Sequence, residues 1–337
     1  MIPREEAERR FAPAPEERAL RVVAAGGGTG LPRVLAGLSG GVEPGSGRPL
    51  DVTAVVATAD DGGSSGALRR SYGIPAPGDA RNCLVALADG LSPLADLFQH
   101  RFDGEGPLAG HTVGNVVLAA LAQRLGDFGA AVEAAARLLD ARGRVLPGAG
   151  TAVDLVAELE GGFTVRGEAA LGRAGAPVRR VRLSRPAAAP ADAIEAVLRA
   201  DLVVLGPGSL YSSVLASLLA DGLAEALERT AATRVLVVNL FTERGETDGY
   251  TAGDHLAAVR RHLGDAVDVA LVHRGKLPVA AIAAAAASGG RPVILDRAAL
   301  EAQGAAVLQA DLAGGSEAGR HDPAKLARAL LAIARMR

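Results

Sequence analysis

The chain has 337 residues, of which 49% are hydrophobic and 22% charged, so its composition excludes an intrinsically disordered protein. A net charge of −2 disfavours a broad nucleic-acid-binding face. The single cysteine, Cys83, excludes an intramolecular disulfide and a cysteine-based metal cage, and we expect it to be a small buried residue. Gly accounts for 43 residues, nearly twice the usual share of about 7%, whereas the aromatic residues are 6 Phe and 3 Tyr.

The first 20 residues alternate acidic residues with Arg and contain Pro, which predicts a disordered, solvated tail. They lack the apolar centre of a signal peptide. The most apolar stretch, residues 277–288, is too short to span a bilayer. We therefore expect a cytoplasmic protein with no membrane partner and no nucleic-acid partner.

From residue 21 onward, short apolar runs alternate with helical patterns. The predicted strands are Arg21–Ala25, Val52–Thr58, Leu202–Leu205, Arg234–Asn239, Val267–Val272, Pro292–Leu295 and Val307–Asp311. The predicted helices are Leu31–Leu38, Asp79–Ala88, Val113–Leu125, Phe128–Leu139, Pro190–Arg199, Ser209–Leu219 and Asp254–His262. Pro32 suits a first helical turn, and Asp79, Ser209, Asp254 and Asp322 suit helix N-caps.

Continuous apolar strands indicate a parallel sheet that is covered on both faces. The sequence thus predicts an α/β fold: a Rossmann-like, doubly wound, mostly parallel sheet in a single domain over residues 21–337. The pattern of residues 79–140 predicts a large helical insertion after the second strand. The pattern of residues 151–184 predicts a small β-arm of short strands and Gly turns.

Two glycine loops follow predicted strands and precede predicted helices. The first contains Gly27, Gly28, Thr29 and Gly30, and the second contains Gly206, Gly208 and Ser209. Such loops let backbone N–H groups approach an anion at a helix N-terminus, so they favour phosphate or dinucleotide binding. Neither a G-x-G-x-x-G fingerprint nor a P-loop is present, and tight strand-to-helix turns alone would also require Gly.

Acidic and polar residues follow the second predicted strand. Asp60 and Asp61 precede a donor-rich loop with Gly62, Ser64 and Ser65, a combination that suits Mg²⁺ together with a phosphate. An Asx turn explains the same residues without a ligand. In the next helix, Asp79 is either a cap or a metal ligand, and Arg81 and Asn82 are placed to hold a phosphate or a hydroxyl group.

Four further segments contain candidate ligand residues. His111 and Asn115 open a helix, Asn239 ends a strand, and Arg320 precedes the last helix. Thr247, Asp248 and Tyr250 lie in a polar loop, where Tyr250 is expected to stack on a base or a sugar. Capping, turn formation and core packing are the alternative roles. The spacings give neither a Ser-His-Asp triad nor a His-x-x-His metal motif.

Several motifs, in this order, resemble one protein family: GGGTG, ATADDGGSSG, PAPGDARNCLVALAD, LAGHTVGN, LLDARGRVLP, LGPGSLYSS and ERGETDGYTAGDH. They resemble the bacterial YvcK-like gluconeogenesis factors, of the superfamily that includes 2-phospho-L-lactate transferase (CofD). The resemblance extends from about Arg21 to the C-terminal helix. It implies a homodimer that binds UDP-sugars such as UDP-N-acetylglucosamine and links carbon metabolism to cell-wall precursor supply and cell shape.

The same resemblance implies a regulated partner enzyme of amino-sugar synthesis, and no reaction is firmly attached to the family. In the transferase relatives, two acidic positions hold a divalent metal, and they match Asp60 or Asp61 and Asp79 here. The helix around 282–287 is nearly all Ala, where the resemblance leads us to expect an aromatic residue near the ligand.

Three functions follow as hypotheses. The first is a regulatory protein that binds a nucleotide sugar without turnover. The second is a Mg²⁺-dependent transferase of a phosphorus-linked group, in which Asp61 and Asp79 would hold the metal ion. The third is an NAD-dependent dehydrogenase, which the sequence supports least because the dinucleotide fingerprint is absent.

Overall fold

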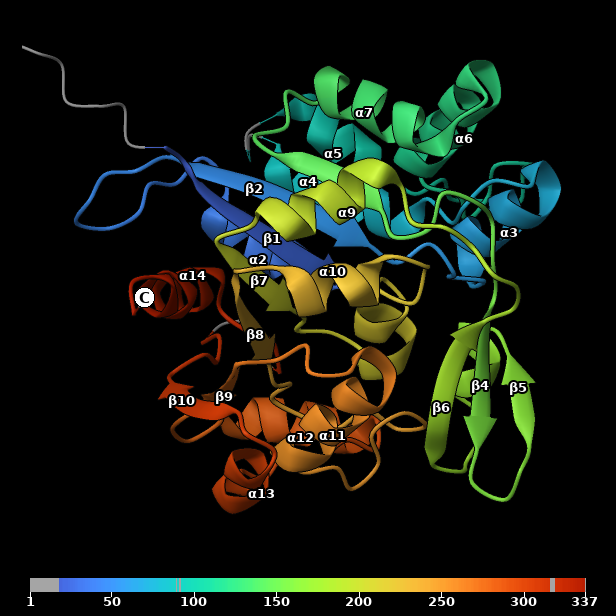
Figure 1. Ribbon diagram of the computed structural model, residues 1–337. Helices are drawn as coiled ribbons and strands as arrows, with labels where there is room; N and C mark the ends of the chain where they lie inside the picture. Colours follow the sequence, from blue (N-terminus) through green and yellow to red (C-terminus); the bar gives the residue numbers. More distant parts are fainter. Residues whose placement is uncertain (1–17, 89, 91, 316–318, 337) are drawn as a thin grey trace, which may run out of the picture.

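The structure is a computed structural model that describes residues 18–88, 90, 92–315 and 319–336 (Figure 1). Residues 1–17 of the predicted tail lie outside the described residues. The predicted tail extends too far, to residue 20, because Leu20 is the buried first residue of strand β1. Its backbone N–H donates to the carbonyl of Pro49.

A seven-stranded sheet, parallel throughout, forms the centre of the molecule in the order β10-β9-β8-β7-β1-β2-β3. Its strands are β1 (Leu20–Gly26), β2 (Leu50–Val56), β3 (Arg144–Pro147), β7 (Leu202–Leu205), β8 (Thr233–Val237), β9 (Val269–His273) and β10 (Ala306–Ala310). β1 lies between β2 and β7, so the strand order reverses at β1. Ligands of doubly wound sheets bind outside the carboxyl ends of the strands at such a switch point.

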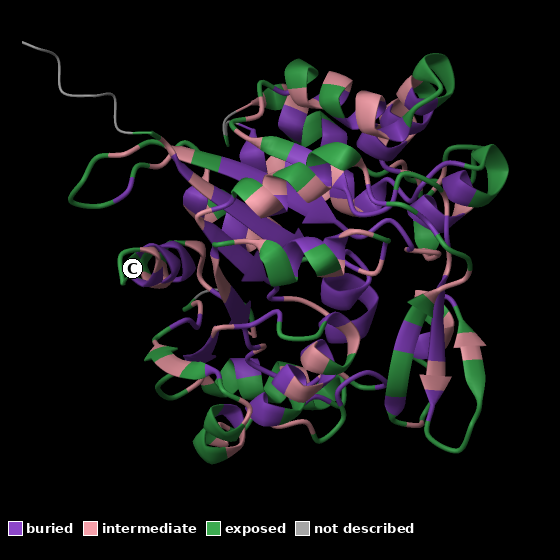
Figure 2. Cartoon of the chain, viewed as in Figure 1, coloured by how far each residue is buried: buried purple, intermediate pink, exposed green. Residues whose placement is uncertain are grey.

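Both faces of the sheet are buried, which explains the continuous apolar strands (Figure 2). In β1, Val22 and Ala24 belong to one hydrophobic core, whereas Val23 and Ala25 belong to the other. Helices α2 (Leu31–Leu38), α4 (Gly78–Leu87), α7 (Phe128–Leu138) and α14 (Pro323–Ala334) contribute to the first core. Helices α9 (Ala191–Arg199), α10 (Leu223–Arg229), α11 (Ala252–Leu263) and α13 (Arg297–Ala302) contribute to the second.

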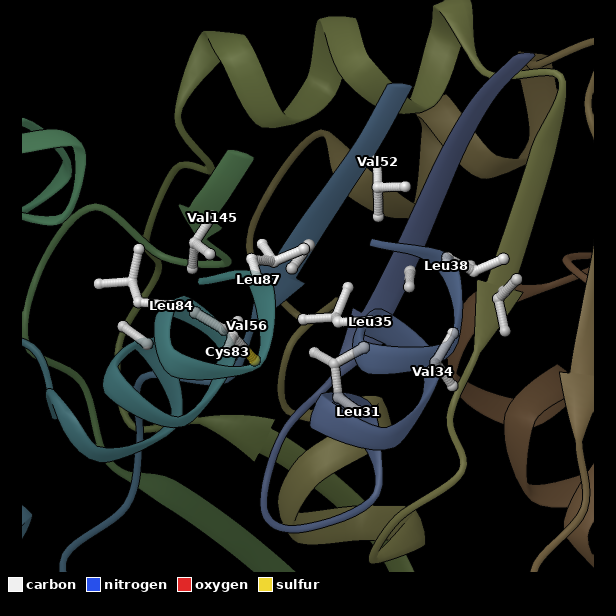
Figure 3. Close-up of a cluster of buried hydrophobic side chains, with 14 of the residues drawn as sticks. Leu31, Val34, Leu35, Leu38, Val52, Val56, Cys83, Leu84, Leu87 and Val145 are labelled. Atoms are coloured by element: carbon white, nitrogen blue, oxygen red, sulfur yellow. The ribbon is translucent and has the colours of Figure 1, made fainter. Parts of the chain in front are cut away.

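The first core shows why α2 and α4 pack on the sheet (Figure 3). Leu31, Leu35 and Leu38 are fully buried and recur at helical spacing, so they form one apolar face of α2. Cys83 of α4 packs in the same core with no exposed surface, which confirms the expectation for this residue. Burial raises the pKa of its thiol well above the usual value.

The helical insertion and the β-arm are both confirmed (Figure 1). Between β2 and β3 lie α3 (Gly63–Tyr72), α4, α5 (Pro93–Gln99), α6 (Val113–Leu125) and α7. The arm is an antiparallel sheet in the order β5-β4-β6, made of β4 (Leu155–Leu159), β5 (Thr164–Arg166) and β6 (Val178–Leu183), with α8 (Glu168–Leu171) after β5. Two further helical segments are the π-helix η1 (Leu210–Leu215) and α12 (Val279–Ala287).

Several local predictions are wrong. Residues 292–295 form only isolated bridges to Phe241 and Thr251 rather than a strand. Residues 63–66 begin α3 instead of continuing a loop. The π-helix replaces most of the α-helix that was predicted from Ser209 to Leu219.

Two of the predicted caps also differ from the structure. Pro77 is the N-cap of α4, and the carboxylate of Asp79 accepts a hydrogen bond from Gly28 instead of capping its own helix. Thr251 is the N-cap of α11, and Asp254 completes a capping box as its N3 residue. The cap at Asp322 is confirmed by a hydrogen bond from the backbone of Lys325. None of the helices in the described residues is long and apolar enough to cross a membrane.

Candidate functional site

A cavity of about 540 Å³ opens at the carboxyl ends of β1, β7 and β8, where the strand order reverses. Six of the predicted ligand residues line it: Thr29, Gly30, Gly208, Ser209, Asn239 and Arg320. Arg33, Glu243 and Arg244 also line it. We call this space the arginine cavity, after Arg33, Arg244 and Arg320.

The two glycine loops meet at one wall of the arginine cavity. A Cβ atom on Gly30 would lie 2.1 Å from the carbonyl oxygen of Pro207, so no side chain fits between the loops. Gly206 and Gly208 adopt φ angles of 76° and 145°, in the region that favours glycine. Close approach of the two backbones therefore explains these glycines, and it leaves backbone groups facing the cavity.

Asn239 holds the second glycine loop in place. Its Oδ1 accepts a hydrogen bond from the N–H of Gly208 at 3.0 Å, and its Nδ2 donates to the carbonyl of Gly208 at 2.8 Å. The end of β8 is thus tied to the loop that follows β7. Asn239 lines the cavity, and its amide also positions the backbone around it.

Three segments far apart in the sequence supply the cations of the arginine cavity. Arg33 comes from α2, Arg244 from the loop after β8, and Arg320 from the segment before α14. Burial and the positive charge of Arg320 lower the pKa of Arg33, but a guanidinium group stays protonated in proteins. This arrangement favours an anionic ligand with oxygen acceptors, such as a phosphate.

Glu243 and His321 are the titratable neighbours of these arginines in the cavity lining. Burial and the nearby Glu246 raise the pKa of Glu243 to about 7, although a hydrogen bond with Ser209 opposes the shift. Burial lowers the pKa of His321 to about 4, so its ring is neutral at pH 7. The arginines therefore determine the positive charge of the cavity.

A second group of polar side chains lies on the other side of the β1 loop. We call Asp60, Asp79, Glu168 and Glu246 the carboxylate cluster. Asp79 accepts a hydrogen bond from the N–H of Gly28 at 2.8 Å, and burial together with the charge of Asp60 raises its pKa to about 7. Burial and the charges of the other three carboxylates raise the pKa of Glu168 to about 8. Burial also raises the pKa of Glu246, whose carboxylate accepts from the backbone N–H groups of Tyr211 and Ser212.

The predicted metal ligands occupy different surroundings. Asp60 accepts a hydrogen bond from the N–H of Gly62, and its charge acts on Asp79. Asp61 instead accepts from the N–H of Ala169 in α8. Within the described ranges, no group of three or more His, Cys, Asp or Glu side chains is arranged to hold a metal ion. Asp60 and Asp79 are the predicted pair that the structure brings together.

The predicted residues of the helical insertion form a network of their own. The hydroxyl of Ser64 lies 3.0 Å from Nδ1 of His111 and accepts from Nδ2 of Asn115 at 3.0 Å. Arg81 donates to Thr112 at 2.5 Å and to Oδ1 of Asn82 at 2.6 Å. Ser65 lies close to Gly78, at the start of α4. These side chains are absent from the lining of the arginine cavity.

The polar loop after β8 is folded largely by its own side chains. Thr247 is fully buried and accepts from the N–H of Glu243, and Asp248 accepts from the N–H of Gly245. The Tyr250 hydroxyl bonds the Tyr211 hydroxyl at 2.8 Å. Thr247, Asp248 and Tyr250 therefore shape the loop, and the lining of the arginine cavity does not include them.

Some lining residues were not among the predicted site residues. Glu243 and Arg244 open the ERGETDGYTAGDH motif, so that motif contained a signal for both, whereas Arg33 lies three residues beyond the GGGTG motif and outside every quoted motif. Ala284, Ala285 and Ser288 come from α12 and the residue after it, which places the Ala-rich helix at the cavity. The lining also includes Phe241, Thr242 and His321.

Comparison with known proteins identifies the class to which this fold and site belong. The sequence profile of 2-phospho-L-lactate transferase CofD matches residues 22–313, and the chain belongs to this family. A gluconeogenesis factor of Halalkalibacterium halodurans is 41% identical, and the match covers 92% of this chain and 95% of that protein. A gluconeogenesis factor of Bacillus subtilis is 40% identical, with coverage of 91% and 95%.

A solved structure supports the same assignment. The crystal structure of a UPF0052 family member from Bacillus halodurans matches with a TM-score of 0.87 and 40% sequence identity. The match covers 93% of this chain and 99% of that one. The resemblance to the YvcK-like group and the Rossmann-like fold class are both confirmed.

Proposed function

We propose that the arginine cavity binds a nucleotide sugar of the UDP-N-acetylglucosamine type. The observation that carries this proposal is the convergence of Arg33, Arg244 and Arg320 on one cavity beside two glycine loops. A diphosphate presents several anionic oxygens, which suit guanidinium groups and backbone N–H donors together. The volume of about 540 Å³ lies within the usual range for small-molecule sites.

The biological role that we propose is regulatory. Relatives at about 40% identity are named gluconeogenesis factors. Binding of a cell-wall precursor would let the protein couple carbon supply to wall synthesis and cell shape. We propose that it acts in the cytoplasm as a homodimer, and that it controls an enzyme of amino-sugar synthesis.

Titration calorimetry with UDP-N-acetylglucosamine tests the ligand. Arg320→Ala should weaken binding about 10- to 100-fold, because hydrogen bonds to charged groups contribute about 1.5–3 kcal/mol. Arg229→Ala, an exposed arginine of α10 outside the cavity, is the matched control and should bind like the unchanged protein. Absence of heat with the unchanged, folded protein would contradict this ligand.

A second candidate function is a phosphorus-group transferase, which the carboxylate cluster favours. Asp60 and Asp79 offer carboxylate oxygens next to the first glycine loop. Burial, and to a smaller extent the charge of Asp60, raises the pKa of Asp79, and a bound divalent cation would offset both. These two residues would hold Mg²⁺, which supplies charge neutralisation at phosphate oxygens when bound. Release of a nucleoside mono- or diphosphate from a panel of nucleotide donors is the test, and Asp79→Asn should abolish it.

A further inference from the structure

Helix α12, at the arginine cavity, is apolar along its whole length and yet mostly exposed. Its nine residues are all Val, Ile or Ala, and Ala281 is the one that is buried. Val279 is 83% exposed and Ile282 is 39% exposed. Helix α11, by comparison, buries seven of its twelve residues. A helix that is apolar on every side is ordinarily a core element, so packing in this conformation does not explain the composition of α12.

The segment that contains α12 is not bonded to the rest of the molecule. Within the part of the chain that the structure describes, residues 276–290 form hydrogen bonds only among themselves. The N–H of Gly290, for example, donates to the carbonyl of Ala285, and the hydroxyl of Ser288 donates to the carbonyl of Ala284. Residues 277–290 carry no charge, so ion pairs do not hold them. Segments with so few tertiary contacts open at a low cost in free energy.

The chain is anchored just before and just after this segment, with a glycine inside each anchor. The N–H of Arg274 donates to the last carbonyl of β10, and the N–H of Arg291 donates to Oγ1 of Thr242. Between these anchors, Gly275 has a φ angle of 120° and Gly289 has one of 84°. Glycine changes its backbone angles at little cost, and hinges are a few such positions at the ends of an element. The helix can therefore turn as a unit between the two glycines.

The cavity side of α12 offers a ligand a surface different from that of the arginines. Ala284, Ala285 and Ser288 line the cavity with methyl groups and one hydroxyl. The end of the segment also touches one of the cations, because a Cβ atom on Gly289 would lie 3.0 Å from Cδ of Arg244. A nucleotide sugar carries uncharged rings beyond its phosphates, and such groups bind on apolar surface.

We propose that α12 is a movable wall of the arginine cavity, which turns about Gly275 and Gly289 and closes on the uncharged part of the bound ligand. Closure brings Ala284 and Ala285 onto that part and excludes water from the arginines, which strengthens their interaction with phosphate oxygens. The inference rests on the proposed function, because a nucleotide sugar is the ligand on which the helix closes. An anion without rings, such as pyrophosphate, contacts the arginines and leaves α12 open.

Amide hydrogen exchange of the full-length protein, followed by mass spectrometry, tests the proposal alongside calorimetry. In the ligand-free protein, we expect the amides of α12 to exchange at least about tenfold faster than those of α11. Saturating UDP-N-acetylglucosamine should slow exchange in α12 at least about tenfold. Pyrophosphate should leave it within about twofold of the ligand-free rate, because pyrophosphate has no part on which the helix can close.

The variant Gly275→Ala tests the hinge without touching the cavity lining. Alanine rarely adopts a φ angle of 120°, so the turn before α12 is disturbed. Protection of α12 by UDP-N-acetylglucosamine should be lost, and affinity should fall at least about threefold, which is a loss of about 0.65 kcal/mol. Gly126→Ala is the matched control: Gly126 ends α6 with a φ angle of 72° and no atom within 4 Å of its Cβ position. It carries similar backbone strain and should keep both the protection and the affinity.

The possible results separate the movable wall from the ligand. Binding heat with unchanged exchange in α12 would overturn the movable wall and leave the proposed function standing, whereas absence of heat would overturn both. Equal exchange of α12 and α11 in the ligand-free protein would overturn the wall by showing a fixed helix. Protection of α12 that follows protein concentration instead of ligand would overturn it by assigning the helix to a contact with a second copy. Full protection in Gly275→Ala would overturn the hinge.

Discussion

The arginine cavity and the carboxylate cluster lie at the same edge of the sheet, on either side of the β1 loop, and burial disfavours charge in both, yet only the carboxylate cluster changes its charge near neutral pH. The three arginines keep their charge because a guanidinium group does not lose its proton in proteins. The carboxyl groups of Asp79 and Glu168 have pKa values near 7 and 8, so their charge changes around neutral pH. One side of the loop thus suits a permanent anion, and the other suits a proton or a cation.

The largest expected effect on ligand binding comes from closing the space between the two glycine loops. In Gly30→Ala, the new Cβ atom would clash with the backbone of Pro207, so the loops must separate. We expect a loss of about 1–3 kcal/mol in the free energy of unfolding and loss of nucleotide-sugar binding. Urea denaturation and calorimetry measure the two effects.

Gly106→Ala serves as the control for Gly30→Ala, because no atom lies within 4 Å of the position of its Cβ. It should leave stability and binding unchanged. Full binding by Gly30→Ala would show that the contact between the loops does not shape the cavity, and would remove the distinction between the two sides of the β1 loop.

Asp79→Asn tests the carboxylate cluster. The pKa of Asp79 is about 7 in the folded protein against 3.8 in the unfolded chain, so its contribution to stability is complete below pH 3.8 and is lost as the pH rises through 7. Asparagine cannot ionise and still offers an oxygen to the N–H of Gly28. The variant should therefore be more stable at pH 8 by on the order of 2–4 kcal/mol, and nearly unchanged at low pH.

Urea denaturation of both proteins from pH 4 to pH 8 measures this difference. Asp127→Asn, at an exposed N-cap of α7 outside the cluster, is the matched control. Its free energy of unfolding should fall between pH 4 and pH 8 as steeply as that of the unchanged protein. Identical pH profiles for Asp79→Asn and the unchanged protein would contradict the burial of a charge at this position.

The smallest effect is expected for Tyr250→Phe. This change removes the hydrogen bond between the Tyr250 and Tyr211 hydroxyls, which contributes about 1 kcal/mol to stability. Nucleotide-sugar binding should not change, because Tyr250 is not part of the cavity lining. A large loss of affinity with little loss of stability would restore the role in stacking that the sequence suggested for this residue.

The sequence predicts most strands of the parallel sheet, because buried strands such as β1 and β7 are short, continuous apolar runs followed by glycine-rich loops. β3 escapes prediction because it has four residues and one of them is Pro147. The run at 292–295 is equally apolar, but it contacts its neighbours only through isolated bridges. Apolar composition alone does not distinguish these two cases.

For the site, glycine loops and a strand-terminal Asn239 are local signals, and the structure places these residues in one wall of the cavity. The residues of the opposite walls are brought to the cavity by the packing of elements that are far apart in the sequence. Arg33 reaches the cavity because α2 packs against α14, and its guanidinium donates to the carbonyl of His321, nearly 300 residues away. Tyr250 looked like a ligand residue because aromatic residues are scarce, whereas its hydroxyl bonds Tyr211 in the interior.

The central position of β1 has a consequence for synthesis on the ribosome. β1 pairs on one side with β7. Val22 can therefore form this pairing only after Leu202 has been synthesised. At about 5–20 residues per second, that interval is about 10–40 s, and residues as late as Arg320 must follow before the cavity is complete. A nascent or truncated chain that lacks these residues therefore lacks a complete arginine cavity.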